Sequence, residues 1–246
     1  MFNLLKIKEF ALNILYPKHL ACIFCDEELD DSASNDTCYE CLYSLPFIQE
    51  GCARCGAKTA DNNDGICLNC KANNFNYDLA RSVFAYKNDV VNAVHKFKYS
   101  SHKYLYEPFG NFLSKYLAMW NISPDFITSV PLHKNKEIER GFNQSKLMAE
   151  IVSKNFAIPY IDICEKIVDN SNQAKLSLKE RRENVKDSYK SIPKINKIIR
   201  DKTILLIDDV YTTGSTVSEV SKIIKYAGAK TVYVLTLAHA IDQQEL

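Results

Sequence analysis

Short apolar runs alternate with amphipathic stretches along the second part of the chain. The runs predict strands at 80–86, 125–130, 203–209 and 231–238, and apolar positions at helical spacing predict helices at 89–99, 104–119 and 141–156. The clearest unit is the last, in which a helix over 216–228, closed by Gly228, joins two continuous apolar strands. A strand, a helix and another strand of this kind form a βαβ crossover. The pattern therefore predicts a parallel sheet covered on both faces.

Cysteines break the pattern of an ordinary globular chain. Eight of the nine form four C-x-x-C pairs: Cys22/Cys25, Cys38/Cys41, Cys52/Cys55 and Cys67/Cys70. Two thiolates three positions apart can bind one metal ion together, and two such pairs complete a tetrahedral site of four sulfurs. Such a site favours Zn²⁺, with an iron–sulfur centre as the alternative. Four thiolates leave no open position, so we expect two structural zinc sites, paired either sequentially or with the first pair joined to the third.

Apolar stretches outside the cysteine pairs are short. Cys164, in the apolar stretch YIDIC, is expected to be a small buried hydrophobic residue rather than a nucleophile. Lys6, Lys8 and Glu9 interrupt the N-terminal apolar stretch, which predicts an amphipathic helix over 1–18 rather than a signal peptide. No run of about 18 apolar residues is present, so we expect no membrane span.

The formal net charge of +1 is a sum of two unlike parts. Residues 1–75 carry six Lys and Arg against eleven Asp and Glu, whereas residues 76–246 carry 25 against 19. Together with the end of the cysteine pairs at Cys70, this shift predicts a double zinc ribbon over 19–75 and an α/β domain over 76–246. The chain has no G-x-G and no Walker-type loop, which excludes dinucleotide-binding and P-loop NTPase folds.

The sharpest chemistry lies in ILLIDDVYTTGST, residues 204–216. Its apolar strand brings Asp208 and Asp209 to the carboxyl end of the sheet, where open α/β sheets bind ligands. The turn that follows has free amides and hydroxyls at the start of a helix and is expected to bind an anion; its residues are Thr212, Thr213, Gly214, Ser215 and Thr216. Carboxylates accept hydrogen bonds from hydroxyls. A phosphate site beside two carboxylates therefore indicates a ribose 5-phosphate ligand.

This segment resembles the motif by which type I phosphoribosyltransferases bind 5-phosphoribosyl 1-pyrophosphate (PRPP). The resemblance implies that Asp208 and Asp209 take the ribose hydroxyls, and that Val210 and the turn 212–216 surround the 5′-phosphate. It also implies the type I fold, a parallel sheet with flanking helices and a hood. Tyr211 departs from the motif, since the family more often has an aliphatic residue there.

Further segments resemble the ComF family, phosphoribosyltransferase-like proteins with an N-terminal zinc ribbon that are associated with natural competence. They are the cysteine pairs, FKY (97–99), VPL (130–132), RGFNQS (140–145) and LSLKERRENV (176–185). The resemblance implies pyrophosphate contact by the loop Val130, Pro131, Leu132 and His133, with Arg140 near the same anion and Mg²⁺ bound to the pyrophosphate. It assigns 176–185 to a mobile hood loop.

Basic residues gather in one segment of the second domain. Residues 175–202 hold ten Lys and Arg against four Asp and Glu. Such a composition is expected either of a flexible loop that closes over pyrophosphate or follows a DNA backbone, or of a solvated helix followed by a linker. Aromatic residues between cations can stack on the bases of single-stranded nucleic acid. The candidates for such contacts are Lys98, Tyr99, Arg140, Lys179, Arg181 and Arg182.

Three functions remain open at this point. The first is phosphoribosyl transfer, in which Asp208, Asp209 and Arg140 are the catalytic candidates and no residue is an evident general base. The second is a non-catalytic adaptor that binds single-stranded DNA, and the third is a regulator that senses PRPP. The ComF resemblance implies a role in DNA uptake, with PRPP or a nucleotide, single-stranded DNA and a competence helicase or DNA-processing protein as partners. It implies a cytoplasmic location, or a peripheral one at the inner membrane with the uptake machinery.

Overall fold

The computed structural model describes residues 20–49, 51–57, 65–99, 102–169 and 187–240. The helix predicted over 1–18 lies outside these ranges. The chain divides into two compact units, Met1–Leu45 and Pro46–Leu246, which we call the ribbon unit and the sheet unit.

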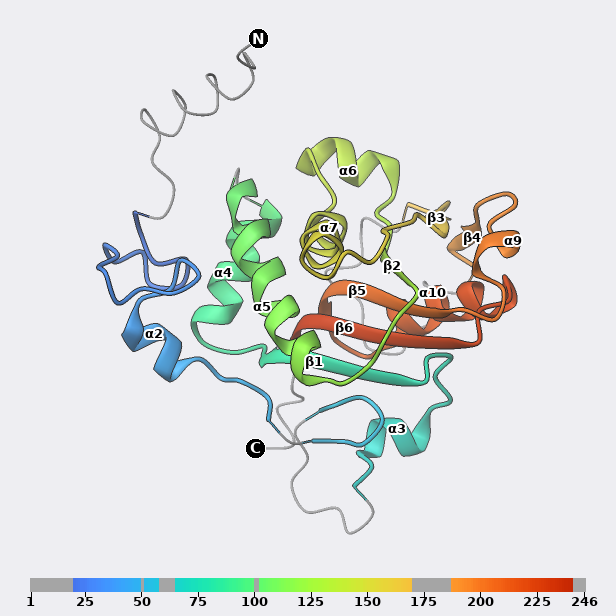
Figure 1. Ribbon diagram of the computed structural model, residues 1–246, viewed down its shortest axis with the longest axis horizontal. Helices are drawn as coiled ribbons and strands as arrows, with labels where there is room; N and C mark the ends of the chain where they lie inside the picture. Colours follow the sequence, from blue (N-terminus) through green and yellow to red (C-terminus); the bar gives the residue numbers. More distant parts are fainter. Residues whose placement is uncertain (1–19, 50, 58–64, 100–101, 170–186, 241–246) are drawn as a thin grey trace. The chain divides into compact units, whose positions relative to one another are not determined.

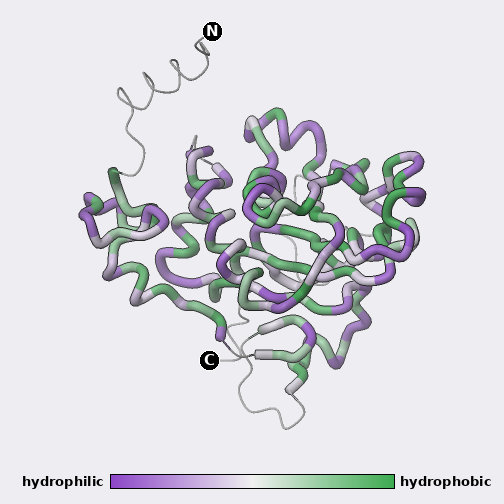
Figure 2. Tube along the Cα trace, in the orientation of Figure 1, coloured by the Kyte–Doolittle hydropathy of each residue, from purple (hydrophilic) through white to green (hydrophobic). Residues whose placement is uncertain are grey.

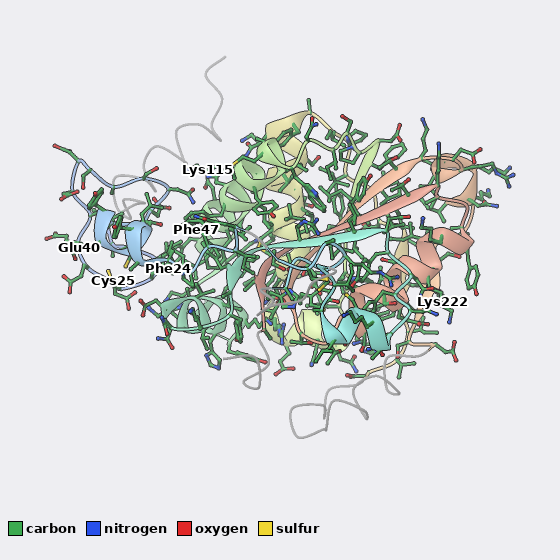
Figure 3. All side chains as sticks on the ribbon, turned by 90° about the horizontal axis from the view of Figure 1, so that it is seen from below. Phe24, Cys25, Glu40, Phe47, Lys115 and Lys222 are labelled. Carbon is green, nitrogen blue, oxygen red and sulfur yellow. The ribbon has the colours of Figure 1, made fainter. Side chains whose placement is uncertain are left out.

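The ribbon unit is a small fold with little regular structure. An isolated antiparallel bridge joins Ala21 to Glu28, and the helix α2 (Tyr39–Ser44) follows Cys38, whose side chain caps it. Phe24 is buried, with 3% of its surface exposed, whereas Cys25 is exposed (Figure 3). Apart from cysteines, the buried apolar side chains among the described residues of this unit are Ile23, Phe24 and Leu45, too few for a core, so we expect its fold to depend on its cysteines.

A four-stranded parallel sheet forms the centre of the sheet unit (Figure 1). Its order is β1 (Leu79–Ala85), β6 (Thr231–His239), β5 (Thr203–Tyr211) and β2 (Phe126–Ser129), and each neighbouring pair is parallel. The predicted βαβ unit is confirmed, with α10 (Ser215–Tyr226) between β5 and β6. Gly228 lies two residues after the helix with a φ of +107°, a conformation that favours glycine.

Longer helices match the amphipathic stretches of the sequence. They are α4 (Asp89–Tyr99), α5 (Tyr106–Met119), which follows a short 3₁₀ turn, η1 (Lys103–Leu105), and α7 (Gln144–Phe156). Several short elements were not predicted, because they are too short to show a periodic pattern. These are α3 (Leu68–Ala72), α6 (Lys134–Arg140), α9 (Asn196–Ile199) and the antiparallel pair β3 (Cys164–Lys166) and β4 (Tyr189–Ser191).

The two faces of the sheet are covered by different elements. Alternate residues Ile204 and Leu206 of β5 share one buried cluster with Val217, Val220 and Ile224 of α10. Since successive strand residues point to opposite faces, the odd-numbered positions face the other way. On that side Tyr233 of β6 contacts Trp120, which ends α5, and α5 packs against α7. Figure 2 shows the hydrophobic colouring of the central strands between these layers.

Candidate functional site

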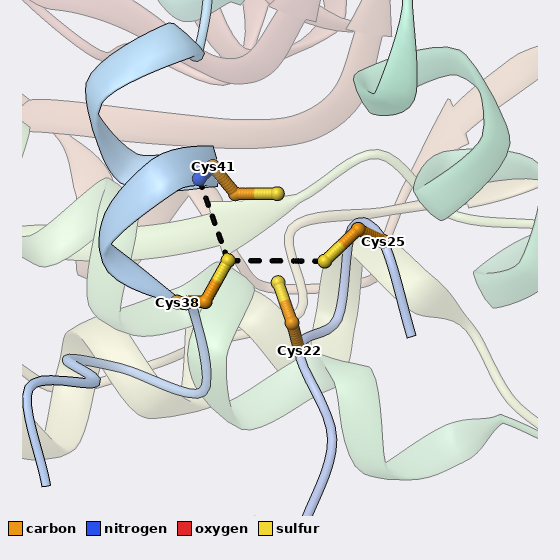
Figure 4. A group of neighbouring side chains, drawn as sticks. All are labelled: Cys22, Cys25, Cys38 and Cys41. Carbon is orange, nitrogen blue, oxygen red and sulfur yellow. Dashed lines mark hydrogen bonds between the residues drawn. The ribbon is translucent and has the colours of Figure 1, made fainter. Parts of the chain in front are cut away.

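The four cysteines of the ribbon unit converge on one point (Figure 4). Cys22, Cys25, Cys38 and Cys41 offer sulfur atoms that all lie within 4.8 Å of one another. The Cys25 and Cys38 sulfurs are 3.8 Å apart, and the backbone amide of Cys41 donates to Cys38 Sγ at 3.4 Å. A backbone donor of this kind stabilises a thiolate that binds metal.

The second tetrad lies inside the sheet unit and is fully enclosed. Cys52, Cys55, Cys67 and Cys70 have exposed fractions of 0%, 0%, 2% and 5%. Their sulfurs lie within 4.8 Å of one another, and those of Cys55 and Cys67 are 3.6 Å apart. The amides of Cys67 and Cys70 donate to sulfurs of the same tetrad, at 3.3 and 3.4 Å.

Both tetrads fit Zn²⁺. A tetrahedral zinc ion with Zn–S bonds of about 2.3 Å places its sulfurs about 3.8 Å apart, close to the separations in each tetrad. The pairing is sequential: the first pair joins the second and the third joins the fourth. The interleaved arrangement is therefore excluded, and the two sets form two cysteine-tetrad zinc-ribbon sites. Zn²⁺ bound there would cross-link the chain, and its closed coordination gives it a structural role.

The acidic pair lies where β5 reaches the end of the sheet. Asp208 is buried, with 8% exposed, and its Oδ1 accepts hydrogen bonds from Ser145 Oγ at 2.8 Å and from the Asp209 amide at 2.9 Å. Asp209 Oδ2 lies 2.9 Å from Lys98 Nζ. Strand β5 thus supplies both carboxylates, while α7 and α4 supply the partners that hold them.

These contacts leave Asp208 and Asp209 electrostatically distinct. Burial and the neighbouring charge of Asp209 raise the pKa of Asp208 to about 7, although the Ser145 hydroxyl opposes the shift. Burial of Lys98 opposes its charge, but the Asp209 carboxylate outweighs it and raises the pKa of Lys98. The site therefore holds one fixed ion pair beside one carboxyl that titrates near neutrality.

The turn after β5 has the features of an anion site. Ser215 begins α10, and its amide and hydroxyl both lie near Thr213 Oγ1, at 3.3 and 2.7 Å. Gly214 has a φ of +79°, and a Cβ at this position would overlap the Tyr211 hydroxyl and approach Phe75 to 3.0 Å. Glycine is therefore required here both by conformation and by space. The N-cap residue Gly214 provides no side-chain cap, so apart from the Ser215 amide, which donates to Thr213 Oγ1, the amides of the first turn are suited to bind an anion.

The expected pyrophosphate loop follows the neighbouring strand β2. The Val130 amide donates to Ile207 O at 3.0 Å, and Asn143 Nδ2 donates to Val130 O at 3.1 Å. His133 caps α6, because its Nδ1 accepts from the Asn135 amide at 3.3 Å. The loop that contains Pro131 and Leu132 thus starts at the same end of the sheet as the acidic pair, and its contact with pyrophosphate stays a prediction.

Arg140 and Lys166 bring positive charge to this region. The Arg140 guanidinium lies 5.1 Å from the centre of the Tyr99 ring, and its Nη1 donates to Gln144 Oε1 at 3.3 Å. Burial and the charges of Lys136 and Arg140 lower the pKa of Lys166, while Asp169 and Asp208 act in the opposite direction. Cations from α6 and β3 therefore share the electrostatic environment of the buried carboxyl.

The structure adds site residues that the sequence did not predict, and it gives one predicted residue a different partner. Ser145 is the last residue of the quoted RGFNQS segment, yet only the fold shows that it donates to Asp208. Lys166 has no motif that could have indicated it. Lys98, expected on a nucleic-acid surface, pairs with Asp209. Lys179, Arg181, Arg182 and the predicted hood loop lie outside the described residues.

Two further expectations concern the remaining thiol and membranes. Cys164 is 6% exposed, and burial raises its pKa, which keeps the thiol protonated. Of the helices that the structure describes, none is long and apolar enough to cross a membrane.

Metal content distinguishes the two tetrads. We expect two zinc ions per chain, measured by elemental analysis, and one after either Cys25→Ser or Cys55→Ser. Because Cys55 lies in the core of the sheet unit and Cys25 does not, only Cys55→Ser should lower the thermal midpoint of that unit, by more than about 10 °C. Equal effects of the two substitutions on that midpoint would contradict this assignment.

The raised pKa of Asp208 predicts how stability depends on pH. The folded pKa of about 7 exceeds the ordinary aspartate pKa of 3.8, so the folded state binds the extra proton and stability falls as pH rises between those values. Asp208→Asn keeps an acceptor for Ser145 and removes the buried charge. It should therefore stabilise the protein at pH 8 more than at pH 4, by on the order of 1 kcal/mol or more in urea unfolding.

Asp125 provides a control of opposite sign. The amide of Thr203 and the Lys202 ammonium lower the pKa of Asp125, so the ionised carboxylate stabilises the folded state. Asp125→Asn should destabilise the chain at pH 8 and have less effect at acidic pH, below its normal pKa. A parallel response of the two variants would disprove the assignment for Asp208.

Comparisons with known proteins match both parts of the chain. A phosphoribosyl transferase domain model matches residues 143–246, and a double zinc ribbon domain model matches residues 11–71. Competence protein F of Haemophilus influenzae is 28% identical over 230 residues, which cover 89% of this chain and 96% of that protein. Competence protein ComFC of Streptococcus pneumoniae is 31% identical over 157 residues, 64% of this chain and 66% of that protein.

ComFC of Bacillus subtilis is 26% identical over 217 residues, 80% of this chain and 85% of that protein. Similarity to these competence proteins thus extends over both the cysteine module and the α/β domain. A zinc-ribbon match and a phosphoribosyl transferase match in one sequence, together with competence proteins as relatives, confirm the resemblance to the ComF family.

Proposed function

We propose that the sheet unit binds PRPP, or another ligand with a ribose 5-phosphate group, and that the protein acts in the uptake and handling of single-stranded DNA. The observation that carries the proposal is the acidic pair Asp208 and Asp209 directly before an uncapped helix start. The names of the relatives, competence proteins F and ComFC, support the biological context.

Each part of the ligand has a matching group. Asp208 Oδ1 is engaged by Ser145 and a backbone amide, which orients the carboxylate for ribose hydroxyls. The hydroxyls of Thr213 and Ser215 and the amides at the start of α10 suit the 5′-phosphate. Arg140 and Lys166 suit the pyrophosphate, which leaves with the electron pair of the C1–O bond if an acceptor attacks C1.

Mg²⁺ bound with PRPP would neutralise part of the pyrophosphate charge. The side chains described here supply positioning and charge stabilisation, as a phosphoribosyl transfer requires. A protein that binds PRPP without turnover would act as a PRPP sensor. Assay of pyrophosphate release separates transfer from sensing.

Neutralising the acidic pair tests ligand binding. Asp208→Asn and Asp209→Asn should each weaken binding of PRPP with Mg²⁺ by about tenfold to a hundredfold, since hydrogen bonds to charged groups contribute about 1.5–3 kcal/mol. Isothermal titration calorimetry measures the affinity. Asp125→Asn is the matched control, because Asp125 Oδ2 binds the Thr203 amide at the start of β5, at the opposite end of the strand. Unchanged binding in both site variants would refute the proposed site.

A second candidate function is direct binding of single-stranded DNA. Tyr99 is 64% exposed, and Arg140 lies 5.1 Å from its ring centre, so an aromatic face and a cation are presented together. Such a pair can stack on a base and contact a phosphate. The observation favours the adaptor hypothesis for this surface.

Removing the exposed ring tests this candidate. Tyr99→Ala should weaken binding of a short single-stranded oligonucleotide by about five- to a hundredfold, as one stacked base is worth about 1–3 kcal/mol. Affinity should also fall as salt concentration rises. Fluorescence anisotropy measures both. Tyr226→Ala, which removes an 80% exposed tyrosine from α10, is the control; equal losses in the two variants would count against a site at Tyr99.

A further inference from the structure

The segment between the second cysteine tetrad and β1 contacts the phosphate loop directly. Asn69 of α3 lies between the ligands Cys67 and Cys70, and its Nδ2 donates to Thr213 O at 3.5 Å. Asn76 donates to Ser218 Oγ on the first turn of α10 from both its backbone amide and its Nδ2, at 3.1 and 3.0 Å. Hydrogen bonds therefore join Asn69, inside the second tetrad, to the anion-binding turn, and Asn76 to the first turn of the helix that follows it.

Two buried tyrosines form the centre of this contact. Tyr77 and Tyr211 are 3% and 1% exposed, and their hydroxyl oxygens are 2.6 Å apart. The Tyr211 hydroxyl lies directly under Gly214, and the Phe75 ring stacks on Tyr77 with centroids 5.2 Å apart. This hydroxyl pair is shielded from water, so it fixes the position of the Tyr211 ring and thereby of the loop residue Gly214 that lies against it.

The tetrad belongs to the same packed layer. Cys52, Cys55, Cys67 and Cys70 share a buried cluster with Tyr77, Tyr211 and Val217 of α10. Only four residues separate Cys70 from Phe75, so a metal ion that fixes the cysteines also fixes the start of this segment. We call Asn69, Phe75, Asn76 and Tyr77 the loop support.

We propose that the loop support positions residues 212–218 for phosphate binding, so that metal occupancy of the second tetrad and ligand affinity are coupled. This inference rests on the proposed function for the identity of the ligand, but the mechanical link does not depend on it. Asn69 and Asn76 bond Thr213 and Ser218 directly, and Tyr77 bonds the Tyr211 hydroxyl that lies against Gly214, so all three act on the ligand site through other residues and are positioning residues. Coupling between two sites is reciprocal, so a bound ligand must also strengthen metal retention.

Hydrogen exchange of the loop tests the link without any ligand. Tyr77→Phe and Asn76→Ala should each speed amide exchange of the peptide 212–218 by about tenfold, while both zinc ions remain bound. Tyr116→Phe and Asn155→Ala are the matched controls, since Tyr116 lies on α5 and Asn155 bonds α5 from α7. Unchanged exchange in both support variants overturns the proposal.

Calorimetry on the same variants measures affinity for PRPP with Mg²⁺. The support variants should bind about tenfold more weakly, and the controls as the wild type does. If the wild type binds no PRPP, the proposed function fails, and the exchange experiment still decides whether the support exists. If the wild type binds and the support variants bind equally well, the coupling is refuted and the proposed function stands.

The reciprocal effect uses the Cys25→Ser chain, whose remaining zinc occupies the second tetrad. PRPP should slow transfer of this zinc to a chelator by about fivefold or more. Adding Asp209→Asn, which weakens the ligand site, should abolish the protection and so correct for metal binding by PRPP itself. Equal release rates with and without PRPP, in a chain shown to bind it, would overturn the coupling.

Discussion

The carboxylate of Asp208 is a negative charge buried at the end of a parallel strand, and the arrangement of the site follows from it. A buried charge is costly unless it is hydrogen-bonded and balanced. Ser145 of α7 and the Asp209 amide satisfy Asp208, and Lys98 of α4 balances the pair through Asp209. One strand end thereby fixes two helices from distant parts of the sequence, and the same contacts leave a carboxyl that can change charge near neutral pH.

Charge is distributed between the parts of the chain in a way that the total of +1 conceals. Residues 1–45, the ribbon unit, carry eight Asp and Glu against three Lys, and this net negative charge disfavours contact with phosphate backbones. Positive groups instead gather at the carboxyl end of the sheet, where Lys98 pairs with Asp209 and the charges of Asp208 and Arg140 both act on Lys166. The two tetrads also differ in their place in the fold. The second is part of the buried core of the sheet unit, whereas the first lies in the ribbon unit.

Local patterns in the sequence predicted the parts of the fold that depend on neighbouring residues. The helix expected at 89–99 has the bounds of α4, and the acidic pair and its turn lie at the end of β5 as expected. Contacts between distant segments were not predictable, because neither Lys98 with Asp209 nor Tyr77 with Tyr211 shows a periodic or spacing signal. In the sequence, Tyr211 stands out only as a departure from the family motif. In the fold, its hydroxyl forms a hydrogen bond with the hydroxyl of Tyr77.

The enclosed position of the second tetrad has a consequence for biosynthesis. Residues 52–70 leave the ribosome before β5 and β6, and chains fold progressively from the N-terminus as they emerge. Strands β5 and β6 later complete the layer that covers these cysteines, which then have at most 5% of their surface exposed. These cysteines are therefore most accessible to zinc before β5 and β6 are in place, and zinc bound by then is enclosed as the fold is completed.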